Sequence, residues 1–284
     1  MTSSGVNEVG LGVRIGEARR KAGLTQQQLC QKSGLSYSTL AKIERGAIKS
    51  PSVFTIQQIA QTLESTVDSL LGVETKDHKP AKKRSKSGVE FVYFDVNGCL
   101  VHFYHRAFAA IAADTGVSPD IVETTFWHYN DEVCRGDIDM EDYNRLLSEK
   151  FKIKNFDWGR YYLDAVEPIK ESLKTLKWAA DHYKVGLLTN IMPGLLNDLK
   201  AKGYVPNVNY DAVIDSSQVK AIKPETKIYE VATQKTGVKA ENILLIDDSR
   251  ANLMAAETHG WRVLWFDDYR PDESVQRIKA ALEF

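Results

Sequence analysis

The chain has 284 residues, of which 43% are hydrophobic and 26% are charged, and its formal net charge is -1. This length allows two domains with cores of their own, and the composition excludes a mainly disordered chain. No apolar run approaches the roughly 18 residues that span a bilayer, and the N-terminus has no signal-peptide pattern. We therefore expect a cytoplasmic protein with no membrane partner. Because Cys30, Cys99 and Cys134 are odd in number and widely spaced, reduced thiols are expected rather than disulfides or a zinc site.

Charge is distributed unevenly along the chain. Residues 1–88 carry 14 basic and 7 acidic side chains, whereas residues 89–284 carry 23 and 31. This division fits an end that faces nucleic acid joined to an end that does not. An ordinary solvated surface is the alternative.

The first domain is predicted over residues 10–72, and its pattern is helical. Apolar residues recur at spacings of three and four, without the alternation typical of strands. Thr25, Ser36 and Ser52 stand where a hydroxyl can accept hydrogen bonds from the first free amides of a helix. The predicted helices cover residues 12–22, 26–33, 37–45 and 53–64, with a short turn at 66–71.

Residues 73–88 are predicted to form a basic flexible linker. The stretch 74–88 has six basic side chains and no apolar residue beyond Ala81, so burial cannot offset its ordering entropy. A basic arm that touches DNA phosphates and a merely solvated tether both remain open.

A second domain, of α/β type, is predicted over residues 89–284. Buried-strand candidates lie at 89–94, 185–188, 212–214, 243–246 and 263–266, and helical stretches separate the last four. This alternation predicts a Rossmann-like parallel sheet that binds ligands at the carboxyl ends of its strands. About 70 mostly helical residues follow the first strand, too many for a simple connection. We expect them to form an inserted helical cap at about residues 102–167.

Residues 25–46 carry a motif of two helices joined by a short turn. Apolar residues such as Leu29 and Leu40 can lock the helices together, leaving the second helix free to enter a major groove. The run resembles the repressor/Cro-like (XRE-type) helix-turn-helix family, over about 60 residues. The resemblance implies double-stranded DNA as a partner and a homodimer on inverted half-sites; a module used only for dimerisation or protein docking is the alternative. It places five side chains on the DNA side: Gln26, Tyr37, Ser38, Thr39 and Lys42.

Four polar motifs follow predicted strands, and they begin with Asp95, Thr189, Lys223 and Asp247. An aspartate such as Asp95 can attack phosphorus, while a threonine and a lysine can stabilise the phosphoryl oxygens. The acidic pair Asp247 and Asp248 offers hard oxygen ligands of the kind that Mg²⁺ prefers. In this order the motifs resemble the haloacid dehalogenase (HAD) superfamily over residues 89–284.

This resemblance implies a Mg²⁺-dependent phosphatase that acts on a small phosphorylated metabolite. It assigns catalysis to Asp95, Asn97, Thr189 and Lys223, and substrate binding to Thr189, Asn190 and Lys223. The implied metal ligands are Asp95, Asp248 and the main-chain carbonyl of Asn97, with Asp247 acting largely through water.

Asn97 departs from the phosphatase pattern, in which an aspartate at this position is the general acid and base. An amide cannot transfer that proton, and the loss is worth about 10²–10⁴ in rate. Branches resembling glucose-1-phosphatases and epoxide-hydrolase N-domains carry glycine there, so the replacement alone does not establish inactivity. Dehalogenases lack the acidic pair, so Asp247 and Asp248 argue against dehalogenation.

Three functions follow as hypotheses. The leading one is a transcription regulator whose HAD-like domain binds or slowly hydrolyses a phosphorylated ligand. The others are a phosphatase for which DNA binding sets location or autoregulation, and a repressor, antitoxin-like or phage-related, that uses a retired HAD domain for dimerisation or docking. Several cap residues could face a substrate, although aromatic residues on helices more often pack in a core: Phe103, His105, Arg106, Phe126, Trp127, His128, Tyr129 and Arg135.

Overall fold

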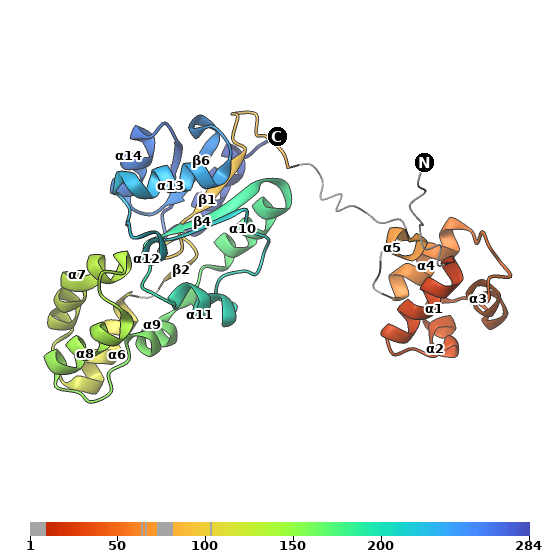
Figure 1. The fold of residues 1–284 in the computed structure, drawn as a ribbon, viewed down its shortest axis with the longest axis horizontal. Helices are drawn as coiled ribbons and strands as arrows, with labels where there is room; N and C mark the ends of the chain where they lie inside the picture. The colour runs from red at the N-terminus through yellow and green to blue at the C-terminus, as the bar shows by residue number, and fades with distance from the viewer. Residues whose placement is uncertain (1–9, 64, 66, 73–81, 103) are drawn as a thin grey trace, which may run out of the picture. The chain divides into compact units, whose positions relative to one another are not determined.

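The computed structural model describes residues 10–63, 65, 67–72, 82–102 and 104–284 (Figure 1). Its contacts divide the chain into two units, Met1–Lys79 and Pro80–Phe284. Among these described residues, no helix is both long and apolar enough to cross a bilayer.

The N-terminal unit is a bundle of short helices. They are α1 (Leu11–Lys21), α2 (Gln26–Ser33), α3 (Tyr37–Glu44), α4 (Val53–Thr62) and α5 (Val67–Leu71). The hydroxyls of Thr25, Ser36 and Ser52 each accept a hydrogen bond from the backbone N–H three residues further on, at 3.1–3.2 Å. These caps begin α2, α3 and α4 at the positions that the sequence predicts.

The core of this unit forms where α1 crosses the two-helix motif. Leu29, Leu40 and Ile43 are fully buried together with Ile15 of α1, as the apolar spacing predicts. Gly12 allows this close packing, because a Cβ there would lie 2.2 Å from the carbonyl oxygen of Ile43.

The C-terminal unit is built on a five-stranded parallel sheet. Its strands are β1 (Phe91–Phe94), β4 (Lys184–Thr189), β5 (Ala212–Asp215), β6 (Ile243–Asp247) and β7 (Arg262–Trp265). Their order is β5-β4-β1-β6-β7, and every neighbouring pair is parallel. Each strand coincides with a predicted one, which confirms the α/β class.

Helices cover both faces of the sheet (Figure 1). Val92 and Phe94 of β1 face a core shared with α10 (Lys170–His182) and α15 (Pro271–Ala281). Phe91 and Tyr93 face the opposite core, shared with α13 (Thr226–Thr236) and α14 (Arg250–Thr258). The same unit also contains α11 (Leu195–Ala201), α12 (Ser216–Val219) and the 3₁₀ turn η1 (Ala240–Asn242). A strand buried on both faces explains the continuous apolar run in β1.

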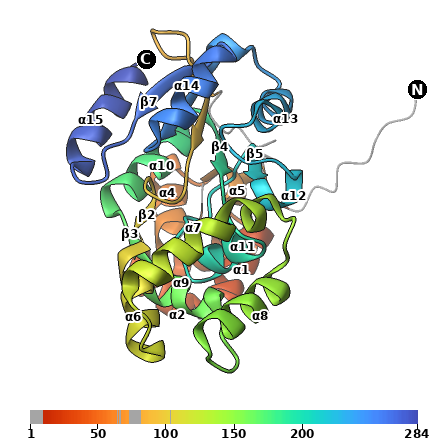
Figure 2. The same ribbon diagram turned by 90° about the vertical axis from the view of Figure 1, so that its left-hand side faces the viewer.

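Four helices inserted after β1 form the cap, which lies at one end of this unit (Figure 2). They are α6 (Tyr104–Thr115), α7 (Pro119–Arg135), α8 (Met140–Phe151) and α9 (Trp158–Ala165). The stem is a short antiparallel pair, β2 (Val101–His102) with β3 (Glu167–Pro168), in the register Val101↔Pro168 and His102↔Glu167. Two-residue strands carry no alternating pattern, so the sequence does not predict them.

The end of the expected linker packs against the C-terminal unit. Residues 73–81 lie outside the described residues, but Lys83 N donates to His182 O at 2.6 Å and Lys86 N donates to Glu283 O at 2.7 Å. The Lys83 amine also lies 3.2 Å from the ring centroid of Phe284. Residues 82–88 are therefore held by main-chain hydrogen bonds, which differs from a flexible tether extending to residue 88.

Candidate active site

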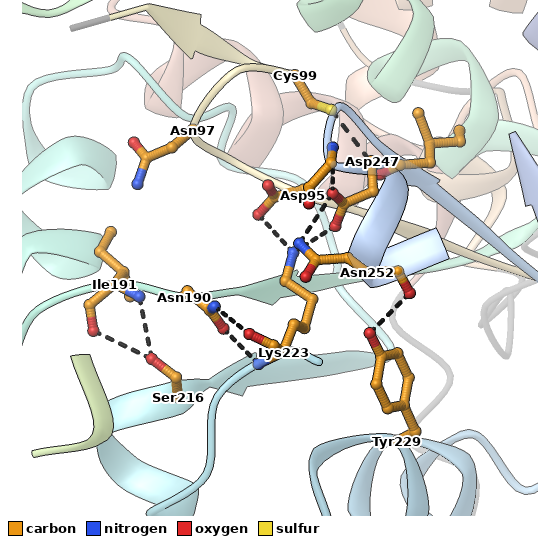
Figure 3. A network of polar contacts seen from close by, with 12 residues as sticks. Asp95, Asn97, Cys99, Asn190, Ile191, Ser216, Lys223, Tyr229, Asp247 and Asn252 are labelled. Carbon is orange, nitrogen blue, oxygen red and sulfur yellow. Dashed lines mark hydrogen bonds and ion pairs between the residues drawn. The ribbon is translucent and has the colours of Figure 1, made fainter. Parts of the chain in front are cut away.

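The site is centred on Lys223, whose amine lies between two carboxylates at the ends of neighbouring strands (Figure 3). Its Nζ lies 3.0 Å from Asp95 Oδ1 and 2.5 Å from Asp247 Oδ2. Asp95 follows β1 and Asp247 ends β6, so the parallel pairing of these strands brings the two acids together. The three side chains are almost fully buried, which leaves their charges to neutralise one another.

Burial and crowding shift the pKa values of the acidic groups upward. Burial raises the pKa of Asp95 to about 7, with Lys223 opposing this shift and the neighbouring carboxylates adding to it. Burial and the charge of Asp247 raise the pKa of Asp248 to about 6. Burial alone would lower the pKa of Lys223, but Asp247 and Asp95 outweigh it and raise that pKa. A cation bound among these carboxylates would favour their charged forms.

A candidate cation site lies beside the ion pair. Ligand atoms of Asp95, Asp248 and Cys99 lie within 4.8 Å of one another. Gly98 makes this possible, because its φ is +83° and a Cβ would lie 2.3 Å from an Asp248 carboxylate oxygen. Burial and the nearby carboxylates raise the pKa of the Cys99 thiol, so it stays protonated. The two carboxylates fit Mg²⁺, which prefers oxygen ligands, and the thiol is a packing neighbour.

Asp247 lies outside that three-residue group. Its Oδ2 contacts Lys223, and its Oδ1 accepts hydrogen bonds from Ser249 N at 2.8 Å and Asn252 Nδ2 at 3.0 Å. These contacts make Asp247 a residue that fixes Lys223 and the loop after β6.

Thr189 supplies an unsatisfied donor at the end of β4. Its hydroxyl is buried, and no hydrogen-bond partner exists for it within the described part of the chain. A buried hydroxyl without a hydrogen-bond partner destabilises the fold by about 1–3 kcal/mol. A phosphoryl oxygen of a bound ligand would supply that partner.

Asn190 holds the main chain of Lys223 in place. Asn190 Nδ2 donates to Lys223 O at 2.8 Å, and Lys223 N donates to Asn190 Oδ1 at 2.7 Å (Figure 3). Asn190 also lines the adjoining cavity. Its main observed role is therefore to position Lys223, a role that the sequence does not indicate.

Asn97 makes a contact with the cap. The buried hydroxyl of Tyr162, on α9, donates to Asn97 Oδ1 at 2.8 Å. This bond fixes the orientation of the amide, and Figure 3 shows Asn97 turned away from the cluster around Lys223. Burial raises the pKa of Tyr162, so the hydroxyl is a fixed donor rather than a base. The position at which a phosphatase would hold an acid and base is thus a neutral hydrogen-bonded pair.

A cavity of about 290 Å³ opens above Asp95, between the sheet and the cap. The cap contributes aromatic and polar walls from α7 and α9: Phe126, Trp127, Asn130, Asp131, Cys134, Trp158 and Tyr162. The core contributes Asp95, Asn97 and Lys223, but not Thr189, together with an apolar group at the start of α11: Ile191, Met192 and Leu195. Of the cap residues considered from the sequence, Phe126 and Trp127 therefore reach the cavity, whereas Phe103 lies outside the described residues.

Arg135 binds the cap to the core instead of facing this cavity. Its guanidinium lies 2.7 Å from Glu225 Oε1, at the start of α13. Beside it, Ser216 Oγ donates to Cys134 O at 2.6 Å. The last turn of α7 is thus anchored to two core segments. The sequence does not identify Tyr162, Asn130, Asp131 or Ser216 as residues of this region. Their partners or the other walls of the cavity lie far from them along the chain.

Four of the five expected DNA-side residues of the N-terminal unit lie on α3, and the fifth, Gln26, is the first residue of α2. Tyr37 is 53% exposed, and Ser38 and Lys42 are exposed as well. Thr39 is half-buried, and its hydroxyl bonds with that of Ser36 at 2.8 Å. Gln26 is also half-buried and donates to Glu44 Oε2 at 2.8 Å, beside the ion pair between Arg19 and Glu44. Three of these side chains are therefore exposed to solvent, whereas that of Gln26 already makes a hydrogen bond within the unit.

Two family models match the chain. Residues 15–70 match the helix-turn-helix model, and residues 89–260 match the model for haloacid dehalogenase-like hydrolases.

Curated relatives resemble separate parts of the chain. The immunity repressor protein of Bacillus phage phi105 is 42% identical over 65 residues, which are 23% of this chain and 44% of the repressor. Acyl-CoA dehydrogenase family member 10 of Mus musculus is 22% identical over 148 residues, 51% of this chain and 14% of that protein. The chain therefore covers less than half the length of either relative.

A solved structure shares the fold of the C-terminal unit. It is a HAD family enzyme from Bacteroides thetaiotaomicron in complex with magnesium and inorganic phosphate, with a TM-score of 0.57 and 17% identity. The match covers 64% of this chain and 95% of the enzyme. With its hydrolase model matched over more than half of its length, the chain belongs to the haloacid dehalogenase-like hydrolase family, and an XRE-type helix-turn-helix domain precedes that hydrolase domain.

Proposed function

We propose that the protein is a DNA-binding transcription regulator, acting as a homodimer in the cytoplasm, whose hydrolase domain binds a small phosphorylated ligand with Mg²⁺ and hydrolyses it slowly. The observation that carries this proposal is the contrast between a buried Lys223–Asp95–Asp247 cluster and the Asn97–Tyr162 pair beside it. The first retains the groups for binding a phosphoryl oxygen, and the second lacks the group for transferring a proton.

The chain's own residues give each part of this function a role. Asp95 and Asp248 would hold the metal, with the carbonyl of Asn97 as the third protein ligand. Bound Mg²⁺ would offset the negative charge of the phosphoryl group. Lys223 and the buried hydroxyl of Thr189 would bind the phosphoryl oxygens, while Asn190 keeps Lys223 in register.

Hydrolysis would proceed through the carboxylate of Asp95. One carboxylate oxygen of Asp95 would form a bond to phosphorus as the bond between phosphorus and the alcohol oxygen breaks. Water would later cleave the aspartyl phosphate. Both halves of the reaction need a proton transfer at the place occupied by Asn97. Because the amide transfers none, we expect turnover about 10²–10⁴ slower than with an acid at this position.

The catalytic part of the proposal is tested with a panel of phosphomonoesters. The full-length protein should release phosphate slowly and only with Mg²⁺, and Asp95→Asn should abolish that release. Turnover that survives Asp95→Asn would mean that another group, or a contaminant, performs the reaction.

The regulatory part is tested on DNA. Duplexes that bind the full-length protein are selected from a random-sequence pool, and their affinity is measured with and without Mg²⁺ and inorganic phosphate. Coupling requires that the ligand bind the DNA-competent and incompetent states unequally, so the two titration curves should differ. Superimposable curves would remove the sensor role.

In a second candidate function, the hydrolase domain is catalytically inactive and serves for dimerisation or protein docking. The Asn97–Tyr162 hydrogen bond favours it, because it fills the acid and base position with a neutral pair. This alternative predicts that neither inorganic phosphate nor any ester binds with Mg²⁺, and that deleting residues 89–284 weakens self-association.

A further inference from the structure

The cavity between cap and sheet carries an uneven set of charges. We infer that it takes a small phosphomonoester whose organic part has no second anionic group, with amino-alcohol phosphates preferred over neutral ones and carboxylated ones disfavoured. This inference rests on the proposed function, because it concerns the ligand of the same site.

Positive charge is scarce around this cavity. Among its described lining residues the one cationic side chain is Lys223, and that amine already contacts Asp95 and Asp247. The acidic side chains on the wall are Asp95, Asp248 and Asp131. A bound Mg²⁺ and Lys223 would supply three positive charges, and the carboxylates of Asp95, Asp247 and Asp248 already match these with three negative ones before a phosphoryl group binds. A second anionic group would find no further counter-charge.

Nearby cations are engaged with the protein itself. Arg135, at the end of α7, is paired with Glu225 and also lies 3.2 Å from Asp137. Lys220 donates to the carbonyl of Gly136. Neither side chain lines the cavity, and both help to bind the cap to the core.

Asp131 sets the charge at the cap side. It lies on α7, four residues before Arg135, and its exposed carboxylate accepts a hydrogen bond from Asn130 Nδ2 at 3.1 Å. A phosphoryl group bound at Asp95 leaves the organic part of the ester beneath the cap wall that Asn130 and Asp131 share. An ammonium group there would be attracted, and a carboxylate would be repelled.

The remaining wall limits the size and polarity of that organic part. Phe126 and Trp158 from the cap face Ile191, Met192 and Leu195 from the core, which gives the cavity apolar sides. Its volume of about 290 Å³ corresponds to about ten water volumes. This room suits a phosphoryl group with a short organic chain.

Three esters share a two-carbon chain and differ at its far end, which carries an ammonium group, a hydroxyl or a carboxylate: O-phosphoethanolamine, 2-hydroxyethyl phosphate and 2-phosphoglycolate. Titration calorimetry of the full-length protein with Mg²⁺ should rank them in that order. Each step should be about fivefold, the size expected for one solvent-exposed charge contact. An equal affinity for the three, or a preference for 2-phosphoglycolate, overturns the inference.

Substitution of Asp131 ties the ranking to this side chain. Asp131→Asn should bring O-phosphoethanolamine and 2-hydroxyethyl phosphate to equal affinity, and Asp131→Lys should place 2-phosphoglycolate first. Glu132→Gln and Glu132→Lys are matched controls, since Glu132 is the exposed neighbour on α7 and does not line the cavity. A ranking that Asp131→Asn leaves unchanged, or that the Glu132 variants shift equally, contradicts the assignment.

Inorganic phosphate separates this inference from the proposed function. If phosphate binds with Mg²⁺ but the ester ranking is absent, the charge-based ligand class is wrong and the phosphoryl site stands. If neither phosphate nor any ester binds, the inferred ligand class and the proposed function are both wrong.

Discussion

The two functional regions of this chain present their polar side chains in opposite ways. Around α3 of the helix-turn-helix domain, Tyr37 is 53% exposed and Lys42 is exposed. In the hydrolase site the side chains of Lys223 and Asp247 are only 1% and 0% exposed. One region offers separate groups to solvent, whereas the other encloses charges that depend on one another.

This difference decides how each region responds to change. A buried charge is stable only with its partners, so the loss of one group leaves the others unpaired in a poorly solvated place. An exposed group keeps its water whichever neighbour is replaced, and its contribution appears only when DNA arrives. Stability should therefore report on the hydrolase site, and binding should report on the surface of α3.

The largest effect is expected from Lys223→Met. It leaves the carboxylates of Asp95 and Asp247 facing each other without a cation, and we expect a loss of about 3–5 kcal/mol in the free energy of unfolding. Urea denaturation measures it. Lys235→Met, at an exposed position on α13, is the matched control and should change stability by less than about 0.5 kcal/mol. Equal effects of the two substitutions would mean that the buried cluster is not coupled.

Asn97 and Tyr162 give the next largest effect, on rate. Asn97→Asp restores a titratable group, but the Tyr162 hydroxyl would donate to its carboxylate and lower its pKa, which weakens it as an acid. We expect Asn97→Asp to raise phosphatase kcat about tenfold over the parent protein. The double substitution of Asn97→Asp with Tyr162→Phe should raise it about 10² over the parent.

Two single substitutions complete that comparison. Tyr162→Phe alone should not raise kcat, because it supplies no acid. Tyr161→Phe removes the neighbouring cap hydroxyl, which donates to Asp114, and should leave the gain from Asn97→Asp unchanged. Equal rates for Asn97→Asp with and without the Tyr162 hydroxyl would show that the cap does not tune this position.

Local signals in the sequence were sufficient for most of the fold. Thr25, Ser36 and Ser52 mark helix starts through bonds within four residues, and the apolar run of β1 reflects burial on both faces. Three of the four motifs were also predictable as a group, because Asp95, Thr189 and Asp247 lie at the carboxyl ends of parallel strands, which meet at one edge of the sheet. Lys223 instead follows α12, eight residues after β5 ends at Asp215.

The contacts between cap and core could not be predicted in this way. Tyr162 meets Asn97 across 65 positions, and Arg135 meets Glu225 across 90, with no periodicity that links either pair. The hydrogen bond from Gln26 to Glu44 likewise depends on how α2 packs against the end of α3. Such pairs arise from tertiary packing, so the residue types alone do not reveal them.

Acidity should weaken Mg²⁺ binding in the hydrolase site. Burial raises the pKa of Asp95 to about 7 and that of Asp248 to about 6, so the metal-free site binds protons that Mg²⁺ must displace. Both folded-state values exceed the unfolded ones, so the metal-free protein loses stability as pH rises from about 4 to 7. Mg²⁺ affinity should instead fall as pH decreases, by about tenfold per unit below pH 6 for each proton displaced. Calorimetry between pH 5.5 and 8 measures this; a constant affinity would place the metal elsewhere.

The smallest effect is expected at Lys42, on the exposed side of the comparison. Lys42→Ala should leave the free energy of unfolding within about 0.5 kcal/mol, because the side chain is exposed on α3. If Lys42 contacts a phosphate, the slope of log affinity against log salt should decrease in magnitude by about 1, with equal weakening on selected and unrelated duplexes. Fluorescence anisotropy at several salt concentrations separates the alternatives. A loss confined to the selected duplex would assign Lys42 to a base edge, and no loss on either would move the DNA contact away from this face of α3.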